Sequence, residues 1–172
     1  MLPEALIRRE RPIMTRHVVS APLVSRHHVQ RIEGSPARAF ALLCPSAEED
    51  WLDGWRFEMV HSVSGVAEKG CVFQTRQHGA EPTLWFTSDY EPNERIRFIR
   101  FTPGEALTEI DIRLAPAAHG CDVDIRYTVT GLAPGAEAAL AAFSQERWTA
   151  MMDFWERSMN HYLTTGARLP AS

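Results

Sequence analysis

The sequence has few cysteines and no concentration of positive charge. Its 3 cysteines, Cys44, Cys71 and Cys121, are far apart and form no CxxC pair, so neither a disulfide framework nor a zinc site is expected. The formal net charge is -4, and charges of both signs are mixed along the chain, without the basic stripe of a nucleic-acid-binding protein. We therefore predict no bound metal and no nucleic-acid partner.

Long hydrophobic runs are also missing. None approaches the roughly 20 apolar residues that a membrane-spanning helix needs. No apolar stretch follows Arg8 and Arg9, as a twin-arginine signal peptide would require. The P-loop, GxGxxG and HExxH motifs are absent, and no Ser–His–Asp order is found. These absences predict a cytoplasmic protein with no membrane span and no cofactor.

What is present fits one ordinary globular domain, since the chain has 172 residues, of which 45% are hydrophobic and 23% charged. Residues 1–24 contain Pro3, Pro12 and Pro22 and show no clear period, which predicts a flexible N-terminal arm. Residues 25–166 are predicted to form the domain, and residues 167–172 a short tail.

Alternation of apolar and polar residues predicts a sheet. Residues 25–33 alternate weakly, and the period is two again in the segments 55–63, 71–78, 83–90, 95–101, 107–114 and 121–130. In the clearest strand Val123, Ile125, Tyr127 and Val129 share one face. Short turns between these segments predict antiparallel strands with one apolar face.

Two short helices are predicted between the first two strands. Ser35 and Pro36 begin a helix over 37–43, because serine is a good N-cap and proline suits the first turn. Ser46 is predicted to cap a second helix that ends near Leu52. Glu48 and its acidic neighbours fall in the first turn, where the helix dipole favours negative charge, and we expect them to be solvated.

The C-terminal part changes to a period of 3.6, which predicts one long amphipathic helix over 136–163. Its bulky stripe comprises Leu140, Ser144, Trp148, Met151, Trp155, Met159 and Tyr162. A sheet of about seven strands must cover its apolar face, and this helix is the element long enough to do so. We therefore predict an α+β helix-grip fold, in which a curved antiparallel sheet with two short helices after its first strand wraps around a long C-terminal helix.

Several segments resemble the SRPBCC superfamily, the group of START domains, polyketide cyclases and birch-pollen-allergen-like proteins. The similar features are the order of elements, the aromatic final helix, the helix start Ser35-Pro36-Ala37-Arg38-Ala39-Phe40 and the turn Tyr90-Glu91-Pro92-Asn93-Glu94-Arg95-Ile96. The segment Trp51-Leu52-Asp53-Gly54-Trp55 is similar to uncharacterised bacterial members. The resemblance covers about residues 25–165 and implies a ligand-binding fold, since members bind lipids, sterols, quinones or polyketides and some are enzymes.

A helix across a curled sheet predicts an apolar pocket for a small hydrophobic ligand. The predicted ligand-binding residues are Trp55, Phe57, Met59, His61, Phe73, Trp85, Phe98, Ile110, Tyr127, Trp148, Met151, Met152 and Trp155. The same bulky side chains suit plain packing, so an interior filled by the protein itself is the alternative.

Catalysis is a further hypothesis. An inward His61 beside Thr75 and Tyr127 could enolise or dehydrate a polyketide-like substrate, whereas the alternative is a core histidine bonded to Thr75 or to a backbone carbonyl. Three classes of function stay open: a small-molecule binder or carrier, a cyclase-like or dehydratase-like enzyme, and a protein-interaction module of the chaperone-activator type. The sequence also leaves open whether the chain forms a homodimer.

Overall fold

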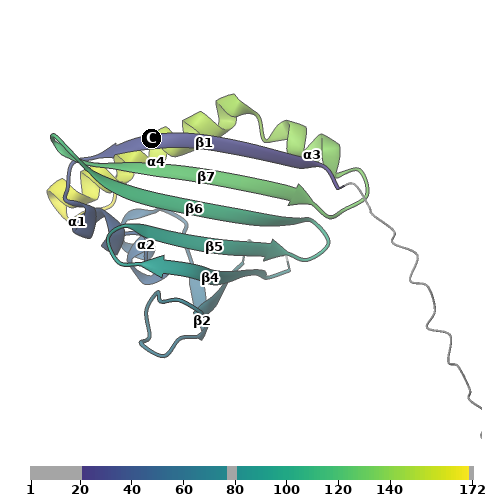
Figure 1. Cartoon of the computed structure of the whole chain (residues 1–172), viewed down its shortest axis with the longest axis horizontal. Helices are drawn as coiled ribbons and strands as arrows, with labels where there is room; N and C mark the ends of the chain where they lie inside the picture. Colours follow the sequence, from purple (N-terminus) through teal and green to yellow (C-terminus); the bar gives the residue numbers. More distant parts are fainter. Residues whose placement is uncertain (1–20, 77–80, 171–172) are drawn as a thin grey trace, which may run out of the picture.

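The computed structural model describes residues 21–76 and 81–170, so most of the predicted arm and the last residues of the tail lie outside the described residues. In chain order the elements are β1 (Leu23–Ile32), α1 (Pro36–Ala41), α2 (Pro45–Trp51), β2 (Phe57–His61), β3 (Val72–Thr75), β4 (Thr83–Glu91), β5 (Arg95–Thr102), β6 (Ala106–Ala117), β7 (Gly120–Gly131), α3 (Ala136–Ala142) and α4 (Gln145–Thr165). The strands form one antiparallel sheet in the order β1-β7-β6-β5-β4-β3-β2 (Figure 1).

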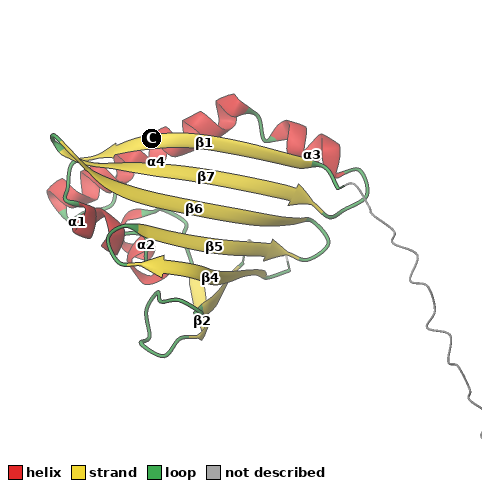
Figure 2. Cartoon of the chain, in the orientation of Figure 1, coloured by secondary structure: helices red, strands yellow, loops and turns green. Residues whose placement is uncertain are grey.

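The helices lie on one face of the curved sheet (Figure 2). The long helix α4 runs along β1, the edge strand, and hydrogen bonds join the two elements. The Asn160 side chain accepts from the backbone N–H of Glu33 at 2.8 Å and donates to the carbonyl of Arg31 at 2.9 Å. The Gln30 side chain donates to the carbonyl of Met152 at 2.8 Å. The two Asn160 bonds satisfy backbone groups at this edge of the sheet. The order of the elements and the position of α4 on the sheet confirm the predicted α+β helix-grip fold.

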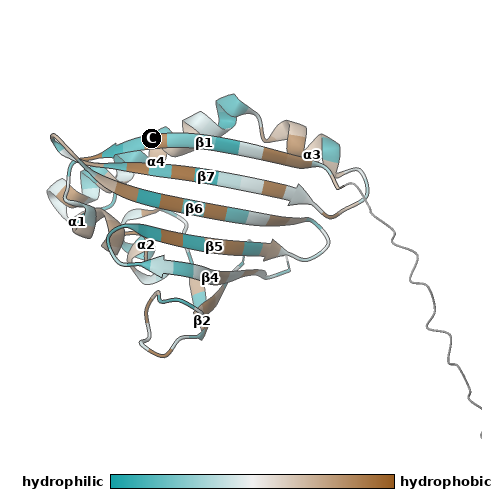
Figure 3. Cartoon of the chain, in the orientation of Figure 1, coloured by the Kyte–Doolittle hydropathy of each residue, from teal (hydrophilic) through white to brown (hydrophobic). Residues whose placement is uncertain are grey.

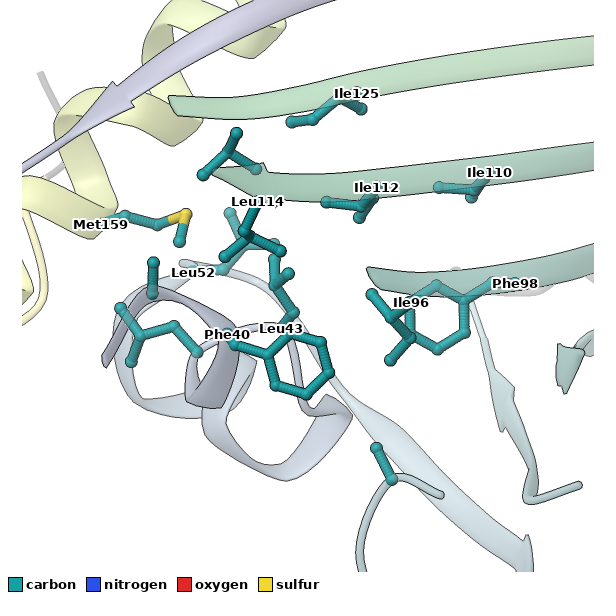
Figure 4. Packing of buried hydrophobic residues seen from close by; sticks show 14 of the residues in the cluster. Phe40, Leu43, Leu52, Ile96, Phe98, Ile110, Ile112, Leu114, Ile125 and Met159 are labelled. Carbon is teal, nitrogen blue, oxygen red and sulfur yellow. The ribbon is translucent and has the colours of Figure 1, made fainter. Parts of the chain in front are cut away.

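The core follows from the alternation along the strands, which Figure 3 shows as alternating hydropathy on β5, β6 and β7. In β7 the predicted face of Val123, Ile125, Tyr127 and Val129 is buried. Side chains of β5, β6 and β7 point toward α1, α2 and α4, where Phe40, Leu43, Leu52 and Met159 meet them (Figure 4). These packed side chains fill one end of the space between the sheet and the helices.

The predicted helix over 136–163 is broken into two. Phe143 leaves the helical conformation with φ -80° and ψ 60°, and α3 ends just before it. Ser144 is the N-cap of α4, and its hydroxyl accepts from the backbone N–H of Arg147 at 3.2 Å. Serine offers the backbone this alternative to a continuing helix, which is why the uninterrupted period was misleading here.

The second short helix begins two residues earlier than predicted. Cys44, and not Ser46, occupies its N-cap position, and Pro45 stands at the start of the first turn. Proline has no N–H to leave unsatisfied there, so it fits that position as well as serine would fit the cap. This start places Pro45, Glu48 and Trp51 on the buried face of α2.

Within residues 21–76 and 81–170, no helix combines the length and the apolar character needed to cross a bilayer. In the same part of the chain, no three His, Cys, Asp or Glu side chains are grouped closely enough to hold a metal ion.

Candidate functional site

A cavity of about 390 Å³ lies between the concave face of the sheet and the helices α2 and α4. The interior is therefore not filled completely by side chains, as the alternative interpretation of the sequence would require. The apolar part of the lining consists of Trp55, Phe73, Trp85, Phe98, Ile110, Ile112, Met151 and Trp155. The exposed residues Gly54, Arg56, Arg76, Glu81 and Glu105 also line it and mark its open side.

Eight of the predicted ligand-binding residues border this cavity: Trp55, Phe73, Trp85, Phe98, Ile110, Tyr127, Met151 and Trp155. Five do not: Phe57, Met59, His61, Trp148 and Met152. Trp148 and Met152 have 0% exposure and belong to the core. Trp148 lies directly behind the site, since its ring centroid is 4.7 Å from that of Tyr127. Phe57 and Met59 are half-buried and pack on the edge of the core.

His61 is not brought together with Tyr127 and Thr75. It lies exposed at the end of β2. The register explains the difference, because Met59 pairs with the buried Phe73 whereas His61 pairs with the neighbouring Val72. Two steps along β2 thus match one step along β3, a β-bulge that reverses the inward and outward alternation beyond it. The predicted inward orientation of His61 is therefore wrong.

Thr75 borders the cavity in the position expected for it, but its partner is different from the one predicted. Its hydroxyl accepts a hydrogen bond from the indole N–H of Trp85 at 3.0 Å. That bond fixes the Trp85 ring, whose own strand position pairs it with Phe73. Thr75 thus orients an aromatic side chain of the lining.

Three rings from neighbouring strands form what we call the aromatic wall: Phe73, Trp85 and Phe98. Phe73 and Trp85 are stacked with their centroids 5.3 Å apart at 14°. Phe98 meets both rings edge-on at 6.0 and 6.1 Å. Trp55 adds a further edge contact on Trp85 at 5.7 Å. Such mutually supporting rings give the cavity one rigid and apolar side.

Arg100 brings a positive charge into the site. It follows Phe98 by two positions on β5, so both side chains point to the concave face. Its guanidinium carbon lies 5.4 Å from the centroid of Trp85 and 6.0 Å from that of Tyr127. One guanidinium nitrogen donates to the hydroxyl of Thr108 at 3.2 Å. Arg100 was not among the predicted site residues, although its position two residues after Phe98 on the same strand would have indicated it.

Glu48 brings a carboxyl group to the opposite side of the cavity, and the prediction that it is solvated is wrong. Its residue is 8% exposed, and burial raises the pKa of its carboxyl well above the ordinary value, with a smaller contribution from Cys44. The group is therefore more easily kept protonated, as a neutral hydrogen-bond donor. The spacing of Pro45, Glu48 and Trp51 on one helix face is the signal that could have found it.

Tyr127 completes the polar part of the lining. Burial raises the pKa of its hydroxyl to about 12, while the nearby positive charge of Arg100 acts in the opposite direction. The hydroxyl is thus neutral at ordinary pH and can donate or accept a hydrogen bond. The predicted apolar pocket is therefore partly polar, because Arg100, Glu48 and Tyr127 all line it.

Comparisons with known proteins identify the fold alone. The sequence matches no protein-family model, and no curated protein is similar to it. Among solved structures, a protein of unknown function from Staphylococcus aureus has 10% sequence identity and a TM-score of 0.64. The alignment covers 86% of this chain and 97% of the Staphylococcus aureus protein. DynU16, a protein in the dynemicin biosynthetic locus, has 16% sequence identity and a TM-score of 0.54. The alignment covers 83% of this chain and 48% of the DynU16 chain.

A further similar structure is the solution structure of the Aha1 dimer from Colwellia psychrerythraea. It has 15% identity and a TM-score of 0.53, covering 80% of this chain and 96% of its own. These similarities support the helix-grip architecture. Because proteins with such different descriptions share it, the architecture does not indicate one function. The function must therefore be argued from the site.

Proposed function

We propose that this chain binds a small, largely apolar molecule in the cavity between the sheet and α4. The observation that carries the proposal is the cavity itself, which has a volume of about 390 Å³ and one side made by the aromatic wall. Ligand pockets in proteins have volumes of roughly 300–1,000 Å³ and combine an apolar lining with a few placed polar groups. The described lining has both features.

The construction of the site favours a preformed pocket over a gap that closes when empty. The rings of the aromatic wall hold one another in place, and Trp85 is fixed further by its hydrogen bond to Thr75. Trp148 supports Tyr127 from behind. Side chains that are already held in one arrangement lose little conformational entropy when a ligand binds, so the site costs little to organise.

The test uses N-phenyl-1-naphthylamine, a neutral dye whose fluorescence rises in an apolar environment. We expect the chain to bind it, and we expect Met151→Trp to abolish the rise because a larger ring on α4 fills the cavity. Ile110→Trp fills the cavity from the sheet side and serves if the first variant is unstable. Ile99→Trp is the matched control, since Ile99 neighbours Phe98 on β5 but faces the other side of the sheet.

The binding function fails if the wild-type protein gives no fluorescence rise, or if the two cavity-filling variants bind the dye as well as the wild type does. Folding of each variant is checked by its circular dichroism and its unfolding temperature. Native mass spectrometry of protein purified from cells complements the titration, because a retained molecule would appear as an added mass that Met151→Trp removes.

Catalysis on the bound molecule is a second candidate, favoured by the presence of Glu48 and Tyr127 in the same cavity. A carboxyl group with a raised pKa beside a neutral phenol is suited to proton transfer. Glu48→Gln and Tyr127→Phe keep the shape of the cavity. An enzyme would lose turnover with either change while still binding the dye, whereas a carrier would show no chemical change of its ligand in the wild type.

A further inference from the structure

The charge of Arg100 distinguishes this cavity from a purely apolar one. A guanidinium group keeps its positive charge at all ordinary pH values. Within the described part of the chain no carboxylate lies within 4.0 Å of Arg100, whose contacts are the Thr108 hydroxyl and the faces of Trp85 and Tyr127. By contrast, Arg95 on the same strand forms a bidentate pair with Asp111, in which it donates two hydrogen bonds of 2.8 and 3.0 Å to the carboxylate.

The buried acidic group of the lining, Glu48, does not compensate this charge. Glu48 is 8% exposed and forms no ion pair among the described residues. Burial of a carboxyl group without a cationic partner favours its neutral form. Tyr127 is neutral as well, because it is buried. The buried part of the lining therefore presents the positive charge of Arg100 together with two groups, Glu48 and Tyr127, whose neutral forms burial favours. The other charged residues of the lining, Arg56, Arg76, Glu81 and Glu105, lie exposed at the open side.

The position of Arg100 relative to the aromatic wall indicates how a ligand would use that charge. Its guanidinium group lies over the Trp85 ring and near the Tyr127 ring, so it joins the apolar side of the cavity to the Tyr127 side. An apolar body packed against the aromatic wall would bring an attached acidic group to Arg100. Guanidinium groups bind carboxylates through two parallel hydrogen bonds, which are stronger than bonds between neutral groups.

We propose that the ligand is a small, apolar carboxylic acid, whose carboxylate is paired with Arg100 while its apolar part contacts the aromatic wall. This inference rests on the proposed binding function and names the chemical class of ligand for the same cavity. The Tyr127 hydroxyl and the Glu48 carboxyl line the same cavity and are available to hydrogen-bond further oxygen atoms of that ligand.

The test compares 2-naphthoate with 2-naphthamide by isothermal titration calorimetry near pH 7. The two probes have nearly the same size and shape, and they differ in charge. We expect the wild-type protein to bind 2-naphthoate at least tenfold more tightly, a difference of about 1.4 kcal/mol. Arg100→Gln should remove this preference by weakening the binding of 2-naphthoate and leaving that of 2-naphthamide within about threefold.

Arg126→Gln is the matched control, because it removes the same charge from the exposed face of β7 and should leave the preference unchanged. Equal affinities of the wild type for the two probes would overturn the proposed ligand class, and so would a preference that survives in Arg100→Gln. This comparison of two probes on the wild type needs no variant to fold.

The failure of this inference can be told apart from failure of the binding function. If N-phenyl-1-naphthylamine binds in the cavity but 2-naphthoate does not, the binding function stands and the carboxylate inference is overturned. If neither the dye nor either naphthalene probe binds, both are overturned.

Discussion

Two adjacent methionines of α4 should respond very differently to truncation, because one is part of the core and the other borders the cavity. Met152 has 0% exposure, and its neighbours close around it. Met151 is half-buried and lines the cavity. Met152→Ala should therefore leave a new void, at a cost of about 2–5 kcal/mol in the free energy of unfolding. Met151→Ala enlarges a space that already exists and should cost about 1 kcal/mol.

For a chain of this size, 1 kcal/mol corresponds to a change of about 2–4 °C in the unfolding temperature. Met152→Ala is thus expected to lower Tm by roughly 4–20 °C, and Met151→Ala by a few degrees. The assay is thermal unfolding followed by circular dichroism, with denaturant unfolding as a second measurement. Equal losses of stability in the two variants, or a larger loss for Met151→Ala, would refute the assignment of one methionine to the core and the other to the cavity.

Three further substitutions test other contacts. Glu48→Gln should raise Tm at pH 7 but change it little at pH 4. The pKa of the Glu48 carboxyl is higher in the folded than in the unfolded protein, so the wild type loses stability as the pH rises above the unfolded pKa. Equal effects of the substitution at both pH values would contradict this. Ser144→Ala should cost about 0.5–2 kcal/mol in denaturant unfolding through loss of the α4 cap, and Ser144→Asn should restore most of it. Asp111→Asn should cost about 1–3 kcal/mol in the same assay by disrupting the paired bonds from Arg95, and a loss no larger than that of Glu94→Gln on an exposed turn would count against it.

The strands were predictable because one face of the sheet is buried. Apolar and polar residues therefore alternate along each strand in the sequence. β7 is the clearest case, with its four inward apolar side chains buried as predicted. Ser35 and Pro36 at the start of α1 were predictable from local chemistry, since the serine hydroxyl accepts from the Arg38 N–H at 3.4 Å. Features that depend on neighbouring residues in the chain were therefore accessible from the sequence.

Features that depend on contacts between distant segments were not accessible in this way. The bulge at the end of β2 is defined by the pairing of β2 with β3. The alternation of Met59 and His61 in the sequence gives no indication of it. The burial of Glu48 depends on where α2 packs against the sheet. An acidic residue in a first helical turn is normally solvated, so local propensity predicted the wrong environment.

Arg100 is an intermediate case. Its parity with Phe98 was available from the sequence, but the expectation of an apolar interior directed attention to the hydrophobic positions. The structure shows why a charge is tolerated there, because two aromatic faces and the Thr108 hydroxyl surround it at the border of an open cavity. Polar residues at inward positions of a strand are thus the best sequence signal for the site in this fold.

The most direct test of a ligand cavity between the sheet and α4 is a titration with 2-naphthol followed by NMR of the isoleucine Cδ1 methyl groups. Ile110 and Ile112 line the cavity, whereas Ile32 lies in the core and Ile99 on the other face of the sheet. An aromatic ring in the cavity should shift the methyl signals of Ile110 and Ile112 strongly and saturably, and those of Ile32 and Ile99 little. Shifts centred on Ile99, or no saturable shift of Ile110 and Ile112, would contradict the account.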